Sequence, residues 1–499
     1  MALTLGELAA GLPGVALQGD AGVRVTAVTA DSRAAGPGVL FVAVRGTGAD
    51  GHAYVAAALA AGSPAVAVMA DAAGQDLPAP PARLVAADTR PLPSLLARRL
   101  YREPDRDLVA AGVTGTNGKT TTAFLLRALL GQLAGPCGLL GTIAYDDGKT
   151  SEPAPLTTPG GPEFWQWLGR MRDHGCGSVA MELSSHALDQ QRTAGLQLDA
   201  AVLTNLGRDH LDYHADLAAY LAAKVRILDL LAGKDGVAVL NASDPALATL
   251  DPGARRAVHF STDPAAAADL VVTDAALGLD GTRLECRWRG RALHLVSPLV
   301  GRFNVENLAA ALAAGLALGY DPDACAEALA AVRQVPGRVE RLDLPGGALA
   351  VVDYAHTADA VAAVLRACDE LGGGRLLVVL GCGGDRDRGK RPLMGRAAAQ
   401  GADLAWITSD NPRSEDPAAI CAEVEAGFLA SGSRRAQGHQ VVVDRREAIE
   451  AALAEARPGD VVVIAGKGHE DYQIVGAERR HFDDREVVRA WLQREADRG

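Results

Sequence analysis

The sequence has few aromatic side chains, no paired-cysteine motif and no long apolar run, and each of these absences excludes a class of protein. Aromatic residues make up only 4% of the 499 residues. The seven cysteines lie far apart without any Cys-x-x-Cys spacing, which argues against a zinc site or a disulfide framework and indicates reduced core thiols. Apolar runs all fall short of the roughly 18–20 residues that span a bilayer.

Runs of basic residues are also lacking. The formal net charge is −12, which disfavours nucleic acid and anionic membranes as partners. The N-terminus has no basic stretch followed by an apolar segment, so no secretory signal is expected. We therefore expect a cytoplasmic monomer that acts on small molecules and has neither a nucleic-acid nor a membrane partner.

The length of the chain and its strand pattern indicate several α/β domains. A chain of 499 residues is too long for one hydrophobic core, and about three domains are expected. Short β-type runs alternate with helical stretches, which predicts an α/β fold with mainly parallel sheets. We predict domains at 1–106, 107–336 and 337–499. The clearest predicted strands are 40–44, 65–69, 108–113, 178–183, 200–204, 237–240, 349–352, 376–380, 404–407 and 461–464.

A phosphate-binding loop is predicted at Thr114-Gly-Thr-Asn-Gly-Lys-Thr120, between a predicted strand and a helical stretch. Gly115 and Gly118 let backbone N–H groups approach phosphate oxygens, Lys119 can reach the β- and γ-phosphates, and the Thr120 hydroxyl can ligate Mg²⁺. ATP is favoured over GTP, because no Asn-Lys-x-Asp guanine-reading motif is present. The alternative is an ordinary glycine-rich turn beside a solvated lysine.

This loop resembles the nucleotide loop of the Mur ligases, ATP-dependent enzymes that add amino acids to peptidoglycan precursors. The resemblance implies a three-domain architecture with a central phosphate-loop ATPase domain and a C-terminal Rossmann-like domain. Six further motifs agree with that family, in order, and most resemble its members that add the third residue: Met181-Glu-Leu-Ser-Ser-His186, Thr204-Asn-Leu-Gly-Arg-Asp-His-Leu-Asp-Tyr-His214, Gly301-Arg-Phe-Asn-Val-Glu-Asn307, Gly337-Arg-Val-Glu-Arg341, Asp353-Tyr-Ala-His-Thr357 and Gly466-Lys-Gly-His-Glu470.

The resemblance implies that ATP phosphorylates the acceptor carboxylate and that an amine then attacks the acyl phosphate. It assigns catalysis to Lys119, Glu182, His210 and Lys224, and it implies Mg²⁺ ligation by Thr120, Glu182, His210 and a carbamoylated Lys224 (N6-carboxylysine). Without the resemblance, Glu182 has the pattern of a solvated or capping residue at the end of a strand. Lys224 has the pattern of an exposed helical lysine.

The resemblance also implies two sets of substrate contacts. The ATP contacts are Thr114, Gly115, Thr116, Asn117, Gly118, Lys119, Thr120, Asn304, Arg341 and Asp353. The contacts to the acceptor, UDP-MurNAc-L-Ala-D-Glu, are Ser32, Thr157, Thr158, Ser184, Gln190 and Arg192. Asn304 and Asn307 resemble the adenine-side contacts of the family, and the alternative for both is helix capping. The alternative for Thr157 and Thr158 is a plain turn.

The incoming amino acid is expected to be a diamino acid, with meso-2,6-diaminopimelate favoured over L-lysine and L-ornithine. The guanidinium fork of Arg413 suits the distal carboxylate, which lysine and ornithine lack. The alternative for Arg413 is a surface arginine paired with Glu415 or Asp416. The implied contacts are Arg391, Asp410, Asn411, Pro412, Arg413, Gly466 and Glu470.

Two other functions compete with this interpretation. Folylpolyglutamate synthetase resembles the chain in its phosphate loop and domain plan, but the Asp410-Asn-Pro-Arg413 loop and the motif at 466–470 disfavour it. A non-catalytic nucleotide-binding scaffold predicts loss of Lys119, Glu182 or His210, and all three residues are present.

Overall fold

The computed structural model describes residues 2–46, 48–72, 82–210, 213–233, 235–278, 280–370, 373–432 and 434–497. Leu211 and Asp212 of the motif at 204–214 lie outside the described residues. By its internal contacts the chain divides into two compact units. Unit 1 comprises Met1–Val271, Arg287–Arg291 and Asn307–Ala328, and unit 2 comprises Val272–Cys286, Ala292–Glu306 and Leu329–Gly499. The predicted three-domain bounds stay a prediction.

The first part of unit 1 is a small sheet in the order β2-β7-β6-β5-β4. It is parallel except for β2, which pairs antiparallel with β7. The elements are β1 (Leu3–Thr4), α1 (Leu5–Ala9), β2 (Val15–Gly19), β3 (Arg24–Val25), β4 (Ala27–Thr29), η1 (Ser32–Ala34), β5 (Val39–Val42), η2 (Gly51–Tyr54), α2 (Val55–Ala60), β6 (Ala65–Met69), β7 (Ala82–Ala86), α3 (Leu92–Leu100) and η3 (Pro104–Asp107).

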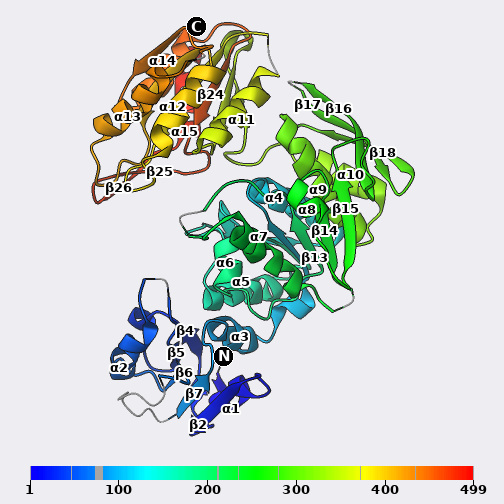
Figure 1. Ribbon diagram of the computed structural model, residues 1–499, viewed down its shortest axis with the longest axis vertical. Coiled ribbons are helices and arrows are strands. Elements are labelled where there is room, and N and C mark those ends of the chain that lie inside the picture. Colours follow the sequence, from blue (N-terminus) through cyan, green and yellow to red (C-terminus); the bar gives the residue numbers. More distant parts are fainter. Residues whose placement is uncertain are drawn as a thin grey trace. The chain divides into compact units, whose positions relative to one another are not determined.

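A larger sheet has the order β11-β10-β9-β12-β8-β13-β14-β15-β16-β17-β18 (Figure 1), and its strands β8 to β15 lie in unit 1. Its strands are parallel from β9 to β16, and β10 and β11 are antiparallel. The strands are β8 (Val109–Thr114), β9 (Cys137–Leu140), β10 (Ala144–Asp146), β11 (Ser151–Pro153), β12 (Ser178–Glu182), β13 (Ala200–Leu203), β14 (Val237–Asn241), β15 (Arg256–Ser261) and β16 (Leu270–Gly278).

Helices separate these strands, as expected for crossovers between parallel strands. They are α4 (Lys119–Leu133), α5 (Gly161–Asp173), α6 (Ser185–Asp189), α7 (Leu217–Val225), η4 (Arg226–Leu230) and α8 (Pro245–Ala248). The central strands β8, β12 and β13 are apolar along almost their whole length and buried, because helices cover both faces of a parallel sheet. The chain continues through β17 (Gly281–Trp288), β18 (Arg291–Ser297), α9 (Arg302–Ala317) and α10 (Pro322–Ala330).

Unit 2 contains a sheet in the order β19-β20-β24-β21-β22-β23, parallel except for β19. Its elements are β19 (Glu340–Asp343), η5 (Pro345–Gly347), β20 (Leu349–Asp353), α11 (Ala358–Asp369), β21 (Leu376–Cys382), α12 (Lys390–Gly401), β22 (Leu404–Ser409), α13 (Pro417–Leu429), β23 (Gly438–Val441), α14 (Arg445–Glu455), β24 (Val461–Ala465), the hairpin β25 (Tyr472–Val475) and β26 (Glu478–His481), and α15 (Asp484–Ala496).

Alternate residues of these strands enter two separate cores, one on each face of the sheet. Val378 of β21 packs in a cluster with Leu365 of α11. Its neighbour Val379 packs in a second cluster with Ile449 of α14. Because both faces are buried, the strands are continuous apolar runs, which is the pattern that made them recognisable in the sequence.

The α/β class, the mainly parallel sheets and the ten predicted strands are confirmed, with bounds that differ by one or two residues. The cysteines are free and buried, also as expected. The sequence did not reveal the short strands β2, β4 and β7 or the long strands β16–β18. Strands β16–β18 carry polar residues at many positions and are buried at only part of their length.

Candidate active site

The phosphate loop joins the carboxyl end of β8 to the start of α4, as predicted. Gly115 and Gly118 have φ angles of 152° and 83°. A Cβ atom on Gly115 would overlap the hydroxyl of Thr204, and one on Gly118 would overlap the amide oxygen of Asn307. The two glycines are therefore required by close packing as well as by backbone conformation.

The segment after β13 braces this loop. Asn117 donates its backbone N–H to Asn205 Oδ1 at 2.8 Å, and Thr204 Oγ1 donates to the Asn117 carbonyl at 2.6 Å. Lys119 Nζ donates to the carbonyls of Gly115 and Thr116, at 2.8 and 2.9 Å. The ammonium group is therefore held at the loop, where phosphate oxygens bind in a loop of this kind.

Glu182 lies at the carboxyl end of β12 and is only 1% exposed, so the solvated or capping alternative is wrong. Its Oε2 accepts hydrogen bonds from Thr120 Oγ1 at 2.9 Å and Thr142 Oγ1 at 3.0 Å. Its Oε1 accepts from the Thr142 backbone N–H at 2.7 Å. A buried carboxylate is thus fixed beside the hydroxyl that ends the phosphate loop.

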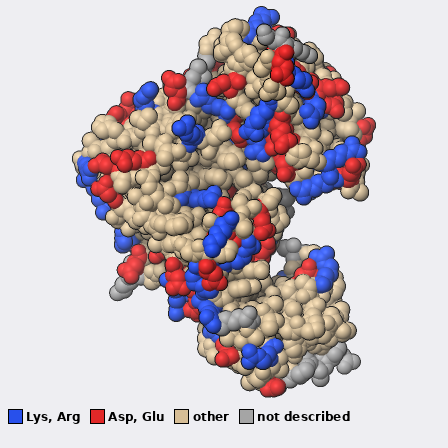
Figure 2. Space-filling model, turned by 180° about the vertical axis from the view of Figure 1, so that it is seen from behind, with Lys and Arg blue, Asp and Glu red and all other residues tan. Residues whose placement is uncertain are grey.

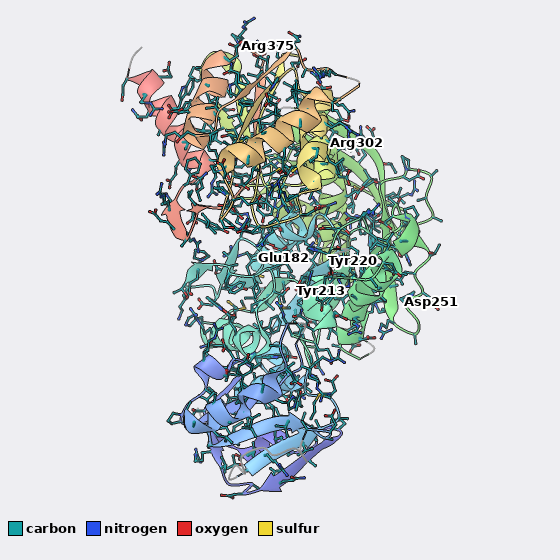
Figure 3. All side chains as sticks on the ribbon, turned by 60° about the vertical axis from the view of Figure 1, so that its left-hand side comes forward. Glu182, Tyr213, Tyr220, Asp251, Arg302 and Arg375 are labelled. Carbon is teal, nitrogen blue, oxygen red and sulfur yellow. The ribbon has the colours of Figure 1, made fainter. Side chains whose placement is uncertain are left out.

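Lys224 is 2% exposed, so its interpretation as an exposed helical lysine is wrong. Its Nζ lies 4.1 Å from the ring centroid of Tyr220, which is labelled in Figure 3. Burial and, to a smaller degree, the nearby charge of Lys119 lower the pKa of Lys224 from 10.5 to about 6, although the charge of Asp209 opposes the shift. Much of this side chain is therefore an uncharged, nucleophilic amine near pH 7.

His210 lies in a cluster of rings that reaches the same tyrosine. Its ring centroid is 4.8 Å from that of His186 and 6.1 Å from that of Tyr220. Tyr213 and His214 complete the cluster, each within 6 Å of His186. His210 has a φ of 53° and its side chain is 43% exposed, so its imidazole is open to solvent or to a ligand.

The donors around Glu182 fit a hard divalent cation in part. Carboxylate and hydroxyl oxygens of Glu182 and Thr120 are the ligand types that Mg²⁺ prefers. Over the described residues, however, no group of three or more His, Cys, Asp or Glu side chains is arranged to hold a metal ion. The fit therefore rests on the carboxylate and hydroxyl pair, and ligation by His210 and Lys224 stays a prediction.

Five of the six predicted acceptor contacts lie together next to this region. Thr142 Oγ1 lies 3.1 Å from Thr157 Oγ1, and Thr158 Oγ1 donates to the Glu182 carbonyl at 2.8 Å. Ser184 donates its N–H to Thr158 Oγ1 at 3.0 Å. The Thr157–Thr158 pair is therefore tied to the buried carboxylate rather than forming a plain surface turn.

Arg192 completes this group. Its Nη1 donates to the Thr158 carbonyl at 3.1 Å, and its Nη2 donates to Gln190 Oε1 at 2.7 Å. Ser32 lies in η1, where Asp31 accepts the N–H of Arg33 at 2.9 Å, and no described contact joins Ser32 to the other five residues. Its role as a nucleotide contact stays a prediction.

The predicted adenine-side residues are divided between the units. Asn307 lies in unit 1, and its Oδ1 accepts from Thr122 Oγ1 at 3.4 Å. In unit 2, Asn304 Nδ2 donates to the Val300 carbonyl at 2.8 Å. Arg341 and Asp353 lie on the neighbouring strands β19 and β20 of unit 2. Burial raises the pKa of Asp353, although Arg338 and two backbone N–H groups oppose the shift.

The predicted amino-acid loop, 410–413, follows β22 in unit 2. Arg413 has a φ of 52°, and its Nη1 donates to the Gly384 carbonyl at 2.8 Å. Neither Glu415 nor Asp416 is its partner, so the alternative of a surface ion pair is not what the structure shows. Glu470 Oε2 accepts from Asn411 Nδ2 at 3.0 Å, which brings the two predicted motifs together.

Arg391 is 1% exposed and already has two carboxylate partners. Its Nη2 lies 2.7 Å from Glu415 Oε1, and its Nη1 lies 3.0 Å from Glu423 Oε2. The hydrogen bonds to Glu415 raise the pKa of Arg391. The structure thus gives Arg391 a role in supporting α12 and α13, and its predicted contact with substrate stays a prediction.

Sequence reasoning missed several residues that build these sites. Thr142 follows β9 and Asn205 follows β13, so their positions after strands were a usable signal. Lys467 is fully buried beside the amino-acid loop and belongs to a motif in which only Gly466 and Glu470 had been chosen. The ring of Tyr220 had no signal beyond its position four residues before Lys224.

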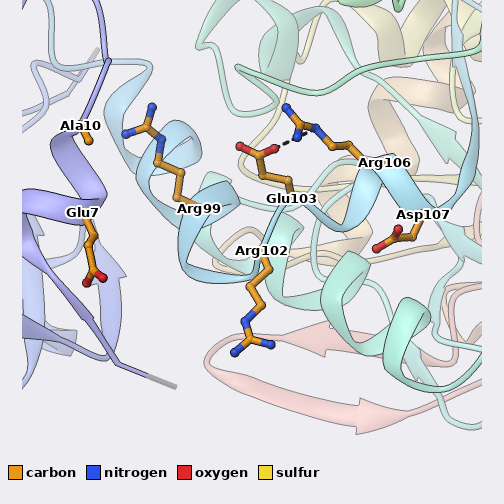
Figure 4. Close-up of a pocket in the computed structure, with 7 residues that line it drawn as sticks. All are labelled: Glu7, Ala10, Arg99, Arg102, Glu103, Arg106 and Asp107. Atoms are coloured by element: carbon orange, nitrogen blue, oxygen red, sulfur yellow. Dashed lines mark ion pairs between the residues drawn. The ribbon is translucent and has the colours of Figure 1, made fainter.

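A surface pocket of about 500 Å³ lies elsewhere in unit 1 (Figure 4). It is lined by Glu7, Ala10, Arg99, Arg102, Glu103, Arg106 and Asp107, and none of the predicted site residues lines it.

On the face seen in Figure 2, acidic and basic side chains are interspersed. None of the described helices has the length and apolar character needed to cross a membrane.

A phosphate loop beside a buried carboxylate, at the carboxyl edge of a parallel sheet, defines the class of phosphate-loop nucleotide-dependent enzymes. Comparison with protein families agrees with this class. Residues 113–315 match the Mur ligase middle domain, residues 337–468 match the Mur ligase glutamate ligase domain, and residues 24–98 match the domain described as Mur ligase family, catalytic domain.

Curated relatives match over nearly the whole length. UDP-N-acetylmuramoyl-L-alanyl-D-glutamate–2,6-diaminopimelate ligase from Geobacter metallireducens is 42% identical, with 96% of each chain covered. The ligase of the same name from Gloeobacter violaceus is 44% identical over 96% of each chain. That from Streptomyces avermitilis is 42% identical over 99% of this chain and 97% of its own. The chain therefore belongs to the Mur ligase family of ATP-dependent acid–amino-acid ligases.

Solved structures agree. A UDP-N-acetylmuramoyl-L-alanyl-D-glutamate–2,6-diaminopimelate ligase is 34% identical, with a TM-score of 0.69, 99% of this chain covered and 100% of that one. Folylpolyglutamate synthase from Mycobacterium tuberculosis is 22% identical, with a TM-score of 0.60 over 75% of this chain and 91% of its own. The second similarity extends to the fold alone.

Proposed function

We propose that this ligase adds meso-2,6-diaminopimelate to UDP-MurNAc-L-Ala-D-Glu, using ATP. The observation that carries the choice of amino acid is the placement of Arg413. Its guanidinium donates to the Gly384 carbonyl, and its charge acts to lower the pKa of Glu470, so the two charges lie within reach of each other. A fixed guanidinium suits a distal carboxylate and a carboxylate suits an ammonium, so the two side chains match the two charges of one amino-acid head. The relatives at 40% identity or more carry the same activity in their names.

The chemistry follows in two balanced steps. A carboxylate oxygen of the acceptor attacks the γ-phosphorus of ATP, and ADP leaves with the electrons of the broken P–O bond. The amine of the diamino acid then attacks the acyl carbon, phosphate leaves, and the amine loses a proton as the amide forms. Lys119 stabilises charge on the transferred phosphoryl group in the first step, because it is held at the loop that cradles the phosphates.

Magnesium is the proposed metal, held by Thr120 and Glu182, with His210 and a carbamate on Lys224 as further candidates. When bound, it would neutralise charge on the phosphates. The lowered pKa of Lys224 supports the carbamate, because its amine must be unprotonated to add to CO₂. Isotopically labelled bicarbonate gives a direct test: a ¹³C carbamate signal is expected in the wild type, and its absence at saturating bicarbonate would exclude the modification.

We further propose that the acceptor contacts Ser32, Thr157, Thr158, Ser184, Gln190 and Arg192, and that ATP contacts the loop at 114–120 together with Asn304, Arg341 and Asp353. Thr157, Thr158 and Arg192 are joined by hydrogen bonds to the Glu182 region, which supports an acceptor whose carboxylate meets the phosphate loop there. We propose that the enzyme works as a monomer in the cytoplasm.

Phosphate release with ATP, Mg²⁺ and UDP-MurNAc-L-Ala-D-Glu tests the proposal, with meso-diaminopimelate, L-lysine and L-ornithine assayed in parallel. We expect turnover with diaminopimelate only. Turnover with lysine or ornithine instead would keep the ligase class and overturn the role of Arg413. Turnover with a folate and glutamate, and not with the muramoyl dipeptide, would favour the folylpolyglutamate synthetase alternative.

A further inference from the structure

Lys467 is a completely buried lysine just beyond the carboxyl end of β24. Its Nζ forms an ion pair with Asp410 Oδ1 at 3.0 Å. It also donates to Asn411 Oδ1 at 3.2 Å and to the Tyr472 carbonyl at 2.7 Å. A buried ammonium is stable only when it is paired and hydrogen-bonded, and here its three partners come from two different segments.

The contacts of Lys467 determine which way the Asn411 amide faces. Asn411 Oδ1 accepts from Lys467 and from the Ile474 backbone N–H, the latter at 3.0 Å. Since both of these groups are donors, the oxygen must face them, and the NH₂ group must face Glu470 Oε2. One buried cation therefore orients, through Asn411, the carboxylate proposed to bind the substrate ammonium.

The same hairpin that Lys467 contacts also holds Arg413. Arg413 donates its N–H to the Ile474 carbonyl at 3.0 Å, and its carbonyl accepts from Gly476 at 2.7 Å. Arg413 keeps a left-handed backbone conformation, which is unfavourable for a residue with a side chain. The loop at 410–413 is thus attached to strand β25 at both of its ends, by Lys467 and by Arg413.

We propose that Lys467 is a positioning residue for amino-acid recognition. By fixing Asn411 and the start of β25, it holds Glu470 and Arg413 at the spacing required by one diamino-acid head. This inference rests on the proposed function. Charges fixed in advance cost little reorganisation when substrate binds, whereas a displacement of about 1 Å lowers efficiency by roughly a hundredfold in well-organised sites.

If Lys467 were only the counter-ion of Asp410, its removal would affect stability and not amino-acid binding. The opposite end of strand β24 offers a matched control for this alternative. Asp460, immediately before this strand, pairs with Arg375 at 2.8 Å (Arg375 is labelled in Figure 3). Lys467 lies just beyond its other end. Removing either cation takes away the ion-pair partner of a buried aspartate in the same unit, but of the two only Lys467 touches the amino-acid loop.

The experiment compares Lys467→Met with Arg375→Met in the full-length enzyme. We expect Lys467→Met to raise KM for diaminopimelate about tenfold or more while KM for ATP changes less than twofold. Arg375→Met should lower the unfolding midpoint without changing either KM. Lys467→Gln, which keeps a donor without charge, should give an intermediate KM. An unchanged KM for diaminopimelate in Lys467→Met, or an equal rise in Arg375→Met, would overturn the proposal.

Hydrogen–deuterium exchange tests the positioning role of Lys467 without requiring ligase activity. It therefore separates this inference from the proposed function and still gives an answer if Lys467→Met is inactive. We expect faster exchange over 408–415 and 470–476 in the Lys467 variants and not in Arg375→Met. Equal exchange in all three variants would overturn the positioning role. If the wild type releases no phosphate with any diamino acid, the proposed function fails, and exchange alone then decides whether Lys467 orders the loop.

Discussion

The phosphate loop of unit 1 and the amino-acid loop of unit 2 occupy equivalent places, because each follows buried parallel strands at their carboxyl ends. They are held in different ways. The loop at 114–120 is held mainly by close backbone approach and by the uncharged side chains of Thr204 and Asn205, together with the contacts of its own Lys119 and of Glu182. The loop at 410–413 is held by buried charges, with Lys467 and Arg445 around Asp410.

The pKa of Asp410 reflects this second arrangement. Burial by itself would raise the pKa, but the charges of Lys467 and Arg445 outweigh burial and hold it below its usual value. Glu470, a few residues away, has its pKa raised by burial and by the charge of Asp410, although Lys467 and Asn411 oppose the shift. The first loop should therefore be sensitive to added volume and the second to removed charge.

The largest effect is expected from Lys119→Ala, which should lower kcat by about a thousandfold or more because it removes the cation that stabilises the phosphoryl group. Phosphate release at saturating substrates measures this change. The exposed Lys149, changed to Ala, is the control and should retain activity. Near-normal turnover in Lys119→Ala would contradict the assignment of the loop to ATP.

Gly115→Ala tests the sensitivity to volume. A methyl group there would overlap the Thr204 hydroxyl, so we expect about a hundredfold loss of kcat/KM for ATP. Gly135→Ala is the control, because Gly135 also has a positive φ, 83° against 152° for Gly115, but nothing within 4 Å of its Cβ position. If the two variants lost the same activity, backbone strain and not close packing would be the cause.

Arg413→Ala tests the sensitivity to charge in the second loop. Loss of a charge-assisted contact should raise KM for diaminopimelate about 10- to 100-fold and leave KM for ATP nearly unchanged. Arg413→Lys keeps the charge but not the planar fork, and a partial recovery is expected. The assignment of Arg413 to the distal carboxylate would not survive an unchanged KM in Arg413→Ala.

The smallest effect concerns the pH dependence of stability. With a pKa of about 6 in the folded chain and about 10.4 in an unfolded one, Lys224 is neutral when folded and protonated when unfolded between these values. The unfolded state then binds the extra proton, so this residue makes stability rise with pH from about 6 to 10. The unfolding midpoint of Lys224→Met should therefore exceed that of the wild type at pH 7, and the difference should shrink by pH 9.

Bicarbonate sharpens this test. A carbamate on Lys224 removes the titrating amine. Saturating bicarbonate should therefore make the difference in unfolding midpoint between wild type and Lys224→Met depend less on pH. A difference that is independent of pH, with and without bicarbonate, would contradict the lowered pKa. The measurement is the urea or thermal unfolding midpoint at several pH values.

Strands and loops with strong local signals were predictable from the sequence. The central strands are apolar throughout because both faces of their sheets are buried, and Thr114–Thr120 has its glycines where the backbone needs them. Segments such as β16–β18 were missed, because their partly exposed strands mix polar and apolar residues. Glu182 and Lys224 were found, but their burial was not, since one residue's exposure depends on distant segments packed around it.

The sequence by itself determined the α/β class, the position of the phosphate loop and the order of the motifs, because these depend on local periodicity and on residues close together in the chain. Only the tertiary structure decided that Thr142 contacts Glu182, that Lys224 is buried and that Lys467 orients Asn411. Those pairs include residues 40 and 56 positions apart. Burial and the pKa values that follow from it arise when separate segments together exclude water, and no single segment carries that information.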